Sequence, residues 1–383
     1  MLYLCGMSGI YIHIPFCKKA CHYCDFHFST SLKYQTEMVD AICREIKMKQ
    51  DRISSQVGSI YFGGGTPSIL SENALQQIFD TINHTFSVDA HAEITIEANP
   101  DDLTAEKLKT LKQLPINRFS VGIQSFFDED LVWMNRAHHA MEAEDCIKRS
   151  QDAGFENLSL DLIYGYPLLS DSKWLDNIHK AIALQAPHLS AYALTVEPKT
   201  ALAHAIKNKK QTPVSDHQSA TQFVMLMNEL VSAGFEHYEI SNFAMPGHYA
   251  VHNTNYWRGV DYIGIGPSAH GFDGQNRYMN PANNAQYMEV LAQNKLPEIV
   301  EELSINDRFN EYMMTSLRTM WGTDLKKIKA DFGSAFLEET NYNLKAFEDK
   351  NWLIIQNDQI KLSESGKLFA DHIASELFII END

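Results

Sequence analysis

The 383-residue sequence contains no long apolar run, and nowhere do eighteen apolar residues follow one another. A chain without such a run is not expected to cross a membrane as a helix. The first residues also lack the basic region, the apolar stretch and the small-residue cleavage site of a secretory signal. We therefore expect a cytoplasmic protein, with Met7 as a candidate for the true first residue.

Basic residues are also scarce, because 32 lysines and arginines stand against 49 aspartates and glutamates, which gives a net charge of −17. This charge repels a nucleic acid backbone, so no nucleic acid partner is expected. It equally gives no attraction to an anionic bilayer. Any association with a membrane would therefore depend on a protein partner.

Cysteine is rare, with six residues in the whole chain, and three of them fall in the short stretch CKKACHYC as Cys17, Cys21 and Cys24. In a reducing cytoplasm, clustered thiols more often bind metal than form disulfides. The other three cysteines are isolated and are expected to have no special role: Cys5, Cys43 and Cys146.

The first half of the chain alternates between strand-like and helix-like segments, which predicts βα units around a parallel sheet. Six strands are expected at 9–16, 58–65, 92–100, 117–125, 157–165 and 188–198. Amphipathic helices are expected between them, for example at 34–50 and 140–154. Each strand ends in residues suited to ligands, and strand ends of this kind meet on one face of a barrel or sheet. One site is therefore expected.

Beyond Pro198 the pattern changes, and the chain is expected to divide into a barrel at 1–235, a flanking segment at 236–300 and a smaller domain at 301–383. The last part reads helix, helix, two-stranded wing, helix, as in a winged helix. It holds 16 acidic and 9 basic residues. That balance favours a packing role over DNA binding. The predicted fold is an incomplete (β/α)6 barrel followed by a small α+β domain.

The spacing of the three thiols leaves two interpretations open. A structural zinc site takes four protein ligands, so zinc would need one of the nearby histidines, His13, His22 or His27. The alternative is a 4Fe–4S cluster held by three cysteines, with one iron left open for a small molecule.

The loop CKKACHYC resembles the cluster loop of the radical S-adenosylmethionine (radical SAM) family. The resemblance implies that the amino and carboxylate groups of S-adenosylmethionine occupy the open iron. One electron from the cluster then cleaves the sulfonium and produces a 5′-deoxyadenosyl radical.

The family resemblance also assigns cofactor-binding roles along the barrel. GGGTPS, with Gly64, Gly65 and Thr66, implies contact with the methionyl amino group, and Glu97 in IEANP implies contact with a ribose hydroxyl. The remaining candidates lie near other strand ends or beside the thiols: Gln124, Arg136, Asp161, Tyr11 and Tyr23. Each of them has an alternative structural role as scaffold.

Within this family the motif spacing resembles the oxygen-independent coproporphyrinogen III oxidases (HemN) and their relatives, the HemW-type haem chaperones. Phe26 stands where the oxidases carry a further cysteine, and the chain begins almost at its first strand, without their longer arm. HNTNYW, residues 252–257, matches a motif associated with haem in HemW-type proteins. A neutral imidazole at His252 suits haem iron, and Tyr256 and Trp257 offer flat surfaces. The alternative for this motif is a histidine that caps a loop beside two core aromatics.

His270 is a further candidate for the same cavity. The function expected from the resemblance is binding of haem and its delivery to acceptor proteins, with respiratory enzymes at the membrane as the expected recipients. The alternative is oxidative decarboxylation of coproporphyrinogen III, so enzymatic activity stays open. The resemblance also allows a homodimer.

Overall fold

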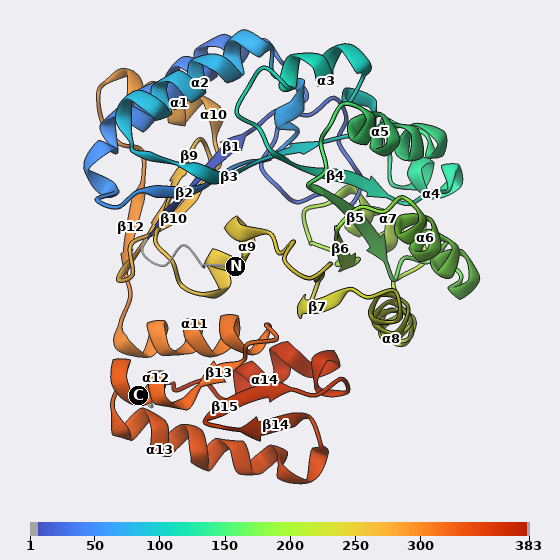
Figure 1. The fold of residues 1–383 in the computed structure, drawn as a ribbon, viewed down its shortest axis with the longest axis vertical. Coiled ribbons are helices and arrows are strands. Elements are labelled where there is room, and N and C mark those ends of the chain that lie inside the picture. Colours follow the sequence, from blue (N-terminus) through green and yellow to red (C-terminus); the bar gives the residue numbers. More distant parts are fainter. Residues whose placement is uncertain (1–6, 381–383) are drawn as a thin grey trace.

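The computed structural model describes residues 7–380, so Cys5 lies outside the described part. Six parallel strands form the centre of the molecule, in the order of the sequence (Figure 1). They are β1 (Ser8–Ile14), β2 (Val57–Gly64), β3 (Val88–Ala98), β4 (Arg118–Gln124), β5 (Leu158–Tyr164) and β6 (His188–Ala193). All six predicted strands are confirmed. The sixth ends at Ala193 rather than at residue 198, because the chain leaves the sheet toward a helix at Ala201.

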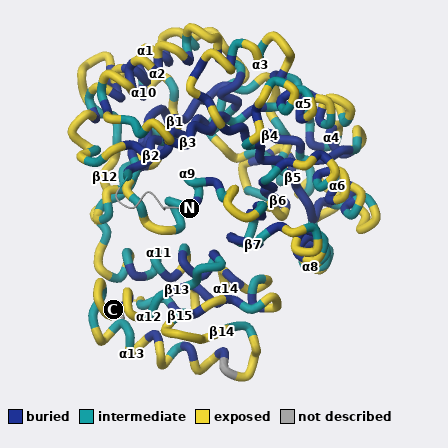
Figure 2. Tube along the Cα trace, in the orientation of Figure 1, coloured by how far each residue is buried: buried dark blue, intermediate teal, exposed yellow. Residues whose placement is uncertain are grey.

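Helices cover the outer face of this curved sheet, and Figure 2 shows buried strands inside a layer of exposed helices. The helices are α1 (Gln35–Met48), α2 (Glu72–Thr85), α3 (Ala105–Leu111), α4 (Asp128–Trp133), α5 (Ala140–Asp152), α6 (Asp171–Ala183), α8 (Asp216–Ser232) and α10 (Asn284–Ala292). Helix α7 (Ala201–Lys207) lies beside the loop that follows β1, because Leu202 N–H donates to His22 O at 2.8 Å. The predicted helices at 34–50 and 140–154 correspond to α1 and α5.

Apolar and polar side chains alternate along the strands, so one face of the sheet packs against the helices and the other face can form a binding site. In β1, Ile10, Ile12 and Ile14 are buried in the core that the helices cover, while Tyr11 and His13 lie between them in the sequence. The interior of a (β/α) barrel is normally filled by branched apolar side chains. Here the interior positions are polar instead, so the barrel is lined for binding rather than packed as a second core.

The sheet continues on both sides beyond the six βα units. The strand order is β12-β11-β10-β9-β1-β2-β3-β4-β5-β6-β8-β7. The added strands are β7 (Glu236–Glu239), β8 (Asn242–Ala244), β9 (Tyr262–Ile265), β10 (His270–Phe272), β11 (Asn276–Met279) and β12 (Ile299–Glu302). The segment 236–300, which we expected to flank the barrel, thus supplies strands to both edges of the same sheet.

The C-terminal domain has its own hydrophobic core, centred on Phe309, Ile328 and Ile373. Its elements are α11 (Ile305–Leu317), β13 (Thr323–Asp324), α12 (Leu325–Asp331), α13 (Ser334–Asn343), β14 (Leu353–Gln356), β15 (Gln359–Leu362) and α14 (Ala370–Glu376). The hairpin β14–β15 is the predicted wing, and with β13 it forms a three-stranded sheet. The wing and the last helix α14 are confirmed, but three helices, α11, α12 and α13, precede the wing where we predicted two, because the segment 325–343 is divided at Gly333 into two short helices.

Helix α9 (Val251–Trp257) carries HNTNYW and lies between the strands of the sheet and α11 (Figure 1). The Glu93 carboxylate accepts the backbone N–H groups of Val251 at 3.0 Å and of His252 at 2.9 Å. A carboxylate at this position satisfies the unpaired N–H groups at the start of a helix. Within residues 7–380, no helix is long and apolar enough to cross a membrane.

Candidate functional site

The three thiols lie in the loop that follows β1, at the carboxyl end of the strands. The turn after α4 anchors this loop, because His22 N–H donates to Met134 O at 3.1 Å and Asn135 Nδ2 donates to Ala20 O at 2.7 Å. On the other side Cys17 N–H donates to Ser29 O at 3.0 Å. The thiol loop is thus held by a segment more than a hundred residues away in the sequence.

Two side chains donate hydrogen bonds to the sulfurs. Thr66 Oγ1 lies 3.6 Å from Cys17 Sγ, and Arg136 Nη1 lies 3.4 Å from Cys21 Sγ. Asn99 joins the two donors, because its Nδ2 donates to Thr66 Oγ1 at 3.1 Å and its Oδ1 accepts from Arg136 Nη2 at 2.5 Å. Asn99 was not predicted from the sequence, although its position directly after the strand of Glu97 was a usable signal.

The environment of the thiols fits an iron–sulfur cluster. Burial raises the pKa of the Cys17 thiol and raises that of Cys24 to about 11. Metal binding displaces such protons, since only the thiolate is a ligand. Arg136 then places a cation beside the resulting negative charge, and hydrogen bonds to sulfur tune a cluster. The Nε of Arg136 is buried and has no hydrogen-bond partner among the described residues.

The described residues form no preformed site for a single metal ion. Residues 7–380 contain no group of three or more His, Cys, Asp or Glu side chains arranged to hold one ion.

The glycine run after β2 allows close packing against the thiol loop. A Cβ at Gly65 would lie 2.5 Å from Phe16 O and 2.7 Å from Ile14 O, which is too close for any side chain. Gly64 has a φ of +100° and donates its N–H to Glu97 Oε2 at 3.2 Å. Both positions therefore require glycine, one for space and one for backbone conformation.

Glu97 faces the barrel interior at the end of β3, where Tyr61 OH donates to its Oε1 at 2.8 Å. We expected the Glu97 carboxylate to need a hydrogen-bond donor from a ligand. The protein itself supplies two donors, Tyr61 OH and the Gly64 N–H. Burial raises the pKa of Glu97 to about 7, and burial also raises the pKa of Asp161, on β5, to about 6. Ser120 Oγ lies 3.0 and 3.1 Å from the two oxygens of Asp161.

The other predicted cofactor residues also lie near the thiols or in the interior. A Cβ at Gly122 would lie 2.9 Å from Gln124 Nε2 and 3.0 Å from Arg136 Nη2, so these two side chains meet there. Tyr23 is half-buried within the loop. Tyr11 OH lies 3.2 Å from His13 Nδ1 in the interior. The structure therefore brings together the thiols, the glycine run, Glu97, Gln124 and Arg136.

His252 lies at the opposite end of the barrel. A Cβ at Gly9, near the start of β1, would lie 3.1 Å from its ring. Its side chain is fully enclosed, with Nδ1 2.8 Å from Ser59 Oγ and Nε2 2.8 Å from Tyr256 OH. Burial lowers the pKa of His252 to about 3, so the imidazole is neutral at physiological pH.

His270 is exposed at the start of β10, near the carboxyl end of β1. Burial is the main cause that lowers the pKa of His13, and the charges of His27 and His270 lower it further. β9 runs parallel to β1, and β10 begins after the end of β9 and runs back so that Phe272 pairs with Tyr262. That His270 shares a cavity with His252 stays a prediction.

A column of aromatic rings connects the two ends of the interior. Tyr11 stacks on Tyr61 with 6.1 Å between ring centroids, and Tyr61 stacks on His252 at 5.3 Å. His252 in turn meets Tyr256 edge-on at 4.8 Å. Because Tyr61 also bonds Glu97, it links the cofactor end of the barrel to HNTNYW. Tyr61 was not predicted from the sequence, where its signal was an inward position in the alternation of its strand.

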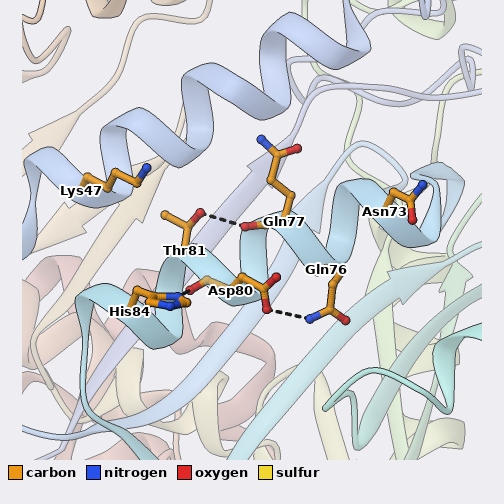
Figure 3. A pocket seen from close by; sticks show the side chains of 7 residues that line it. All are labelled: Lys47, Asn73, Gln76, Gln77, Asp80, Thr81 and His84. Carbon is orange, nitrogen blue, oxygen red and sulfur yellow. Dashed lines mark hydrogen bonds between the residues drawn. The ribbon is translucent and has the colours of Figure 1, made fainter.

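A separate hollow of about 570 Å³ lies on the outer helical layer, between α1 and α2 (Figure 3). Its polar groups bond one another along α2. Gln76 Nε2 donates to Asp80 Oδ1 at 2.7 Å, and Thr81 Oγ1 donates to Gln77 O at 2.8 Å. None of the predicted site residues lines it.

Comparisons with known proteins agree with this geometry. Residues 11–181 match the radical SAM superfamily, and residues 303–369 match the HemN C-terminal domain. A radical SAM match implies a 4Fe–4S cluster and S-adenosylmethionine. The chain is 33% identical to the heme chaperone HemW of Bacillus subtilis, over 96% of this chain and 98% of that protein. It is 32% identical to the heme chaperone HemW of Escherichia coli, over 97% and 98% respectively.

A solved structure, that of coproporphyrinogen III oxidase (HemN) from Escherichia coli, superimposes with a TM-score of 0.84 at 22% identity, over 97% of this chain and 90% of that one. This likeness shows the fold and confirms the predicted architecture.

Proposed function

Because the chain belongs to the HemW family of radical SAM proteins, we propose that it binds haem and delivers it to haem-requiring proteins, with a 4Fe–4S cluster and S-adenosylmethionine at the thiol loop. The observation that carries this proposal is the full-length similarity to heme chaperones, together with a barrel interior in which HNTNYW is joined through Tyr61 to Glu97. One end holds the cofactor residues and the other end holds the motif associated with haem.

In this proposal Cys17, Cys21 and Cys24 hold the cluster, and Thr66 and Arg136 stabilise the thiolates by hydrogen bonds. Held there, a cluster with one open iron would supply electron-transfer chemistry to S-adenosylmethionine. We assign Gly64 and Gly65 to the methionyl group and Glu97 to the ribose, and the close packing of Gly65 on the thiol loop supports this assignment. Among the remaining candidates, Tyr11, Gln124 and Asp161 are assigned to the same interior and Tyr23 to the thiol loop.

His252 is the proposed iron ligand, and its surroundings prepare it for that role. Its burial keeps the imidazole neutral, which is the form that binds a metal. The hydrogen bond between Ser59 and Nδ1 orients the ring, as partners of metal-binding histidines do. Nε2 is bonded to Tyr256 OH. Ligation through Nε2 therefore requires that Tyr256 move away from the imidazole.

His270, exposed at the start of β10, stays a further candidate for the cavity of His252. We propose that the acceptors include respiratory enzymes at the membrane, reached through protein contacts, because the acidic surface offers no attraction to anionic lipid.

An anaerobic titration of the cluster-loaded protein with haem tests the proposal. We expect one-to-one binding by the wild type, loss of binding in His252→Ala, and unchanged cluster absorbance in both. The chain offers a matched control in His188, which is also fully buried and bridges a serine and a tyrosine, Ser159 Oγ at 2.7 Å and Tyr238 OH at 2.7 Å. His188→Ala should retain haem binding.

Equal loss of haem in both variants would mean that His252 acts only as a structural residue. Absence of saturable haem binding in the wild type, with release of carbon dioxide from coproporphyrinogen III by the reduced protein, would replace the chaperone proposal with the oxidase alternative.

A further inference from the structure

A cleft of about 600 Å³ separates the barrel from the C-terminal domain. The end of α9, with Tyr256 and Trp257, lines one side together with the strands β9 and β10, and helices α11 and α12 line the other. Its volume falls within the range of about 300–1,000 Å³ that is usual for small-molecule sites. HNTNYW therefore faces two spaces, since His252 contacts the barrel interior and Trp257 contacts this cleft.

The charge of the cleft is opposite to that of the chain. Four cationic side chains line it, namely Arg258, Arg277, Arg308 and Lys327, against two acidic ones, Glu311 and Asp331. The whole chain carries a net charge of −17. A local excess of positive charge in so acidic a protein indicates a site for an anion.

Two donors in the cleft lack partners. Trp257 Nε1 and Arg308 Nε are buried and have no hydrogen-bond acceptor within residues 7–380. By contrast, Arg277 is paired with Glu311 at 2.5 Å and Lys327 is paired with Asp331. Buried polar groups in proteins are normally satisfied. Two orphan donors on opposite walls of one cleft therefore point to an acceptor that comes from a ligand.

The apolar part of the lining is flat. Besides Trp257, the aromatic rings of Phe272, Tyr312 and Phe332 contribute to the walls. Rings of this kind offer stacking surfaces to a planar ligand.

We propose that this cleft binds a flat tetrapyrrole through its carboxylates, with Arg308 as the main carboxylate partner and Trp257 against the ring. The inference rests on the proposed haem function and adds to it the place where the propionate groups bind. It also gives the C-terminal domain a role, because α11 carries Arg308 and thereby closes the site against the barrel.

Titration of the full-length, cluster-loaded protein with iron(III) protoporphyrin IX and with its dimethyl ester tests this assignment. The ester keeps the ring and the iron but lacks the charged carboxylates. We expect Arg308→Gln to weaken binding of the free acid by about tenfold, as for the loss of one charge-assisted hydrogen bond. Binding of the ester should be the same in Arg308→Gln and in the wild type. Added salt should weaken the wild type more than the variant.

Lys326→Gln is the matched control, because this lysine neighbours Lys327 on α12 but is exposed, pairs with Asp358 at 3.0 Å and does not line the cleft. It should bind both porphyrins like the wild type, and thermal unfolding should show that both variants are folded.

If the wild type binds haem one to one and Arg308→Gln binds the free acid equally well, the cleft assignment is overturned while the proposed function stands. If the wild type binds neither porphyrin, both are overturned.

Discussion

The substitution Glu97→Gln tests whether burial of the Glu97 carboxyl group in the barrel interior lowers the free energy of unfolding as this group ionises. Burial raises the pKa of Glu97 to about 7 from 4.5, so between these values the folded chain is protonated at this site while the unfolded chain is ionised. A group whose pKa is raised on folding in this way lowers stability as the pH rises through the window. The wild type should therefore lose free energy of unfolding from pH 5 to pH 8.

One pKa unit corresponds to about 1.4 kcal/mol, so this residue should account for a loss of about 2–3 kcal/mol across the window. Glutamine cannot ionise, so the variant should not show this part of the loss. The Tyr61 hydrogen bond to Oε1 can be kept by the amide oxygen, whereas the amide nitrogen would face the N–H of Gly64. A pH-independent cost of about 1 kcal/mol is expected from that mismatch.

The assay is urea unfolding of the metal-free, reduced protein at pH 5, 6, 7 and 8, followed by tryptophan fluorescence. Glu106→Gln, at an exposed position on α3, serves as the control for loss of one carboxylate. The stability of the Glu97 variant relative to the wild type should rise by about 2–3 kcal/mol from pH 5 to pH 8. A constant difference across the series would refute the reasoning, because it would mean that Glu97 titrates alike in the folded and unfolded chains.

Two further substitutions test the thiol loop. Arg136→Gln removes the donor to Cys21 Sγ, so the reconstituted protein should hold less iron and sulfide per chain. Its far-ultraviolet circular dichroism spectrum should be unchanged. Full cluster content in this variant would contradict a role for the hydrogen bond. Gly65→Ala places a Cβ 2.5 Å from Phe16 O and should destabilise the chain by about 1–3 kcal/mol in urea unfolding, whereas wild-type stability would show that the loop has room.

The similarity of the two buried histidines shows why sequence alone does not assign such residues. His252 and His188 have nearly the same surroundings, each with a serine on Nδ1 and a tyrosine on Nε2. Only the motif around His252 separated them in the sequence. The two histidines differ in the spaces beside them, because α9, which carries His252, borders both the barrel interior and the interdomain cleft.

The sequence by itself determined the six strands, the thiol loop and the glycine run, because these depend on the alternation of apolar and polar residues and on short motifs. It also determined which face of each strand is polar. These are local properties, and a window of about ten residues contains them.

Only the tertiary structure decided which of these residues meet. Asn99 joins Thr66 to Arg136, Tyr61 joins Glu97 to His252, and Arg308 faces Trp257 across two domains. Such contacts join residues far apart in the chain, and they depend on strand register, on the curvature of the sheet and on how α11 docks, none of which a local pattern contains.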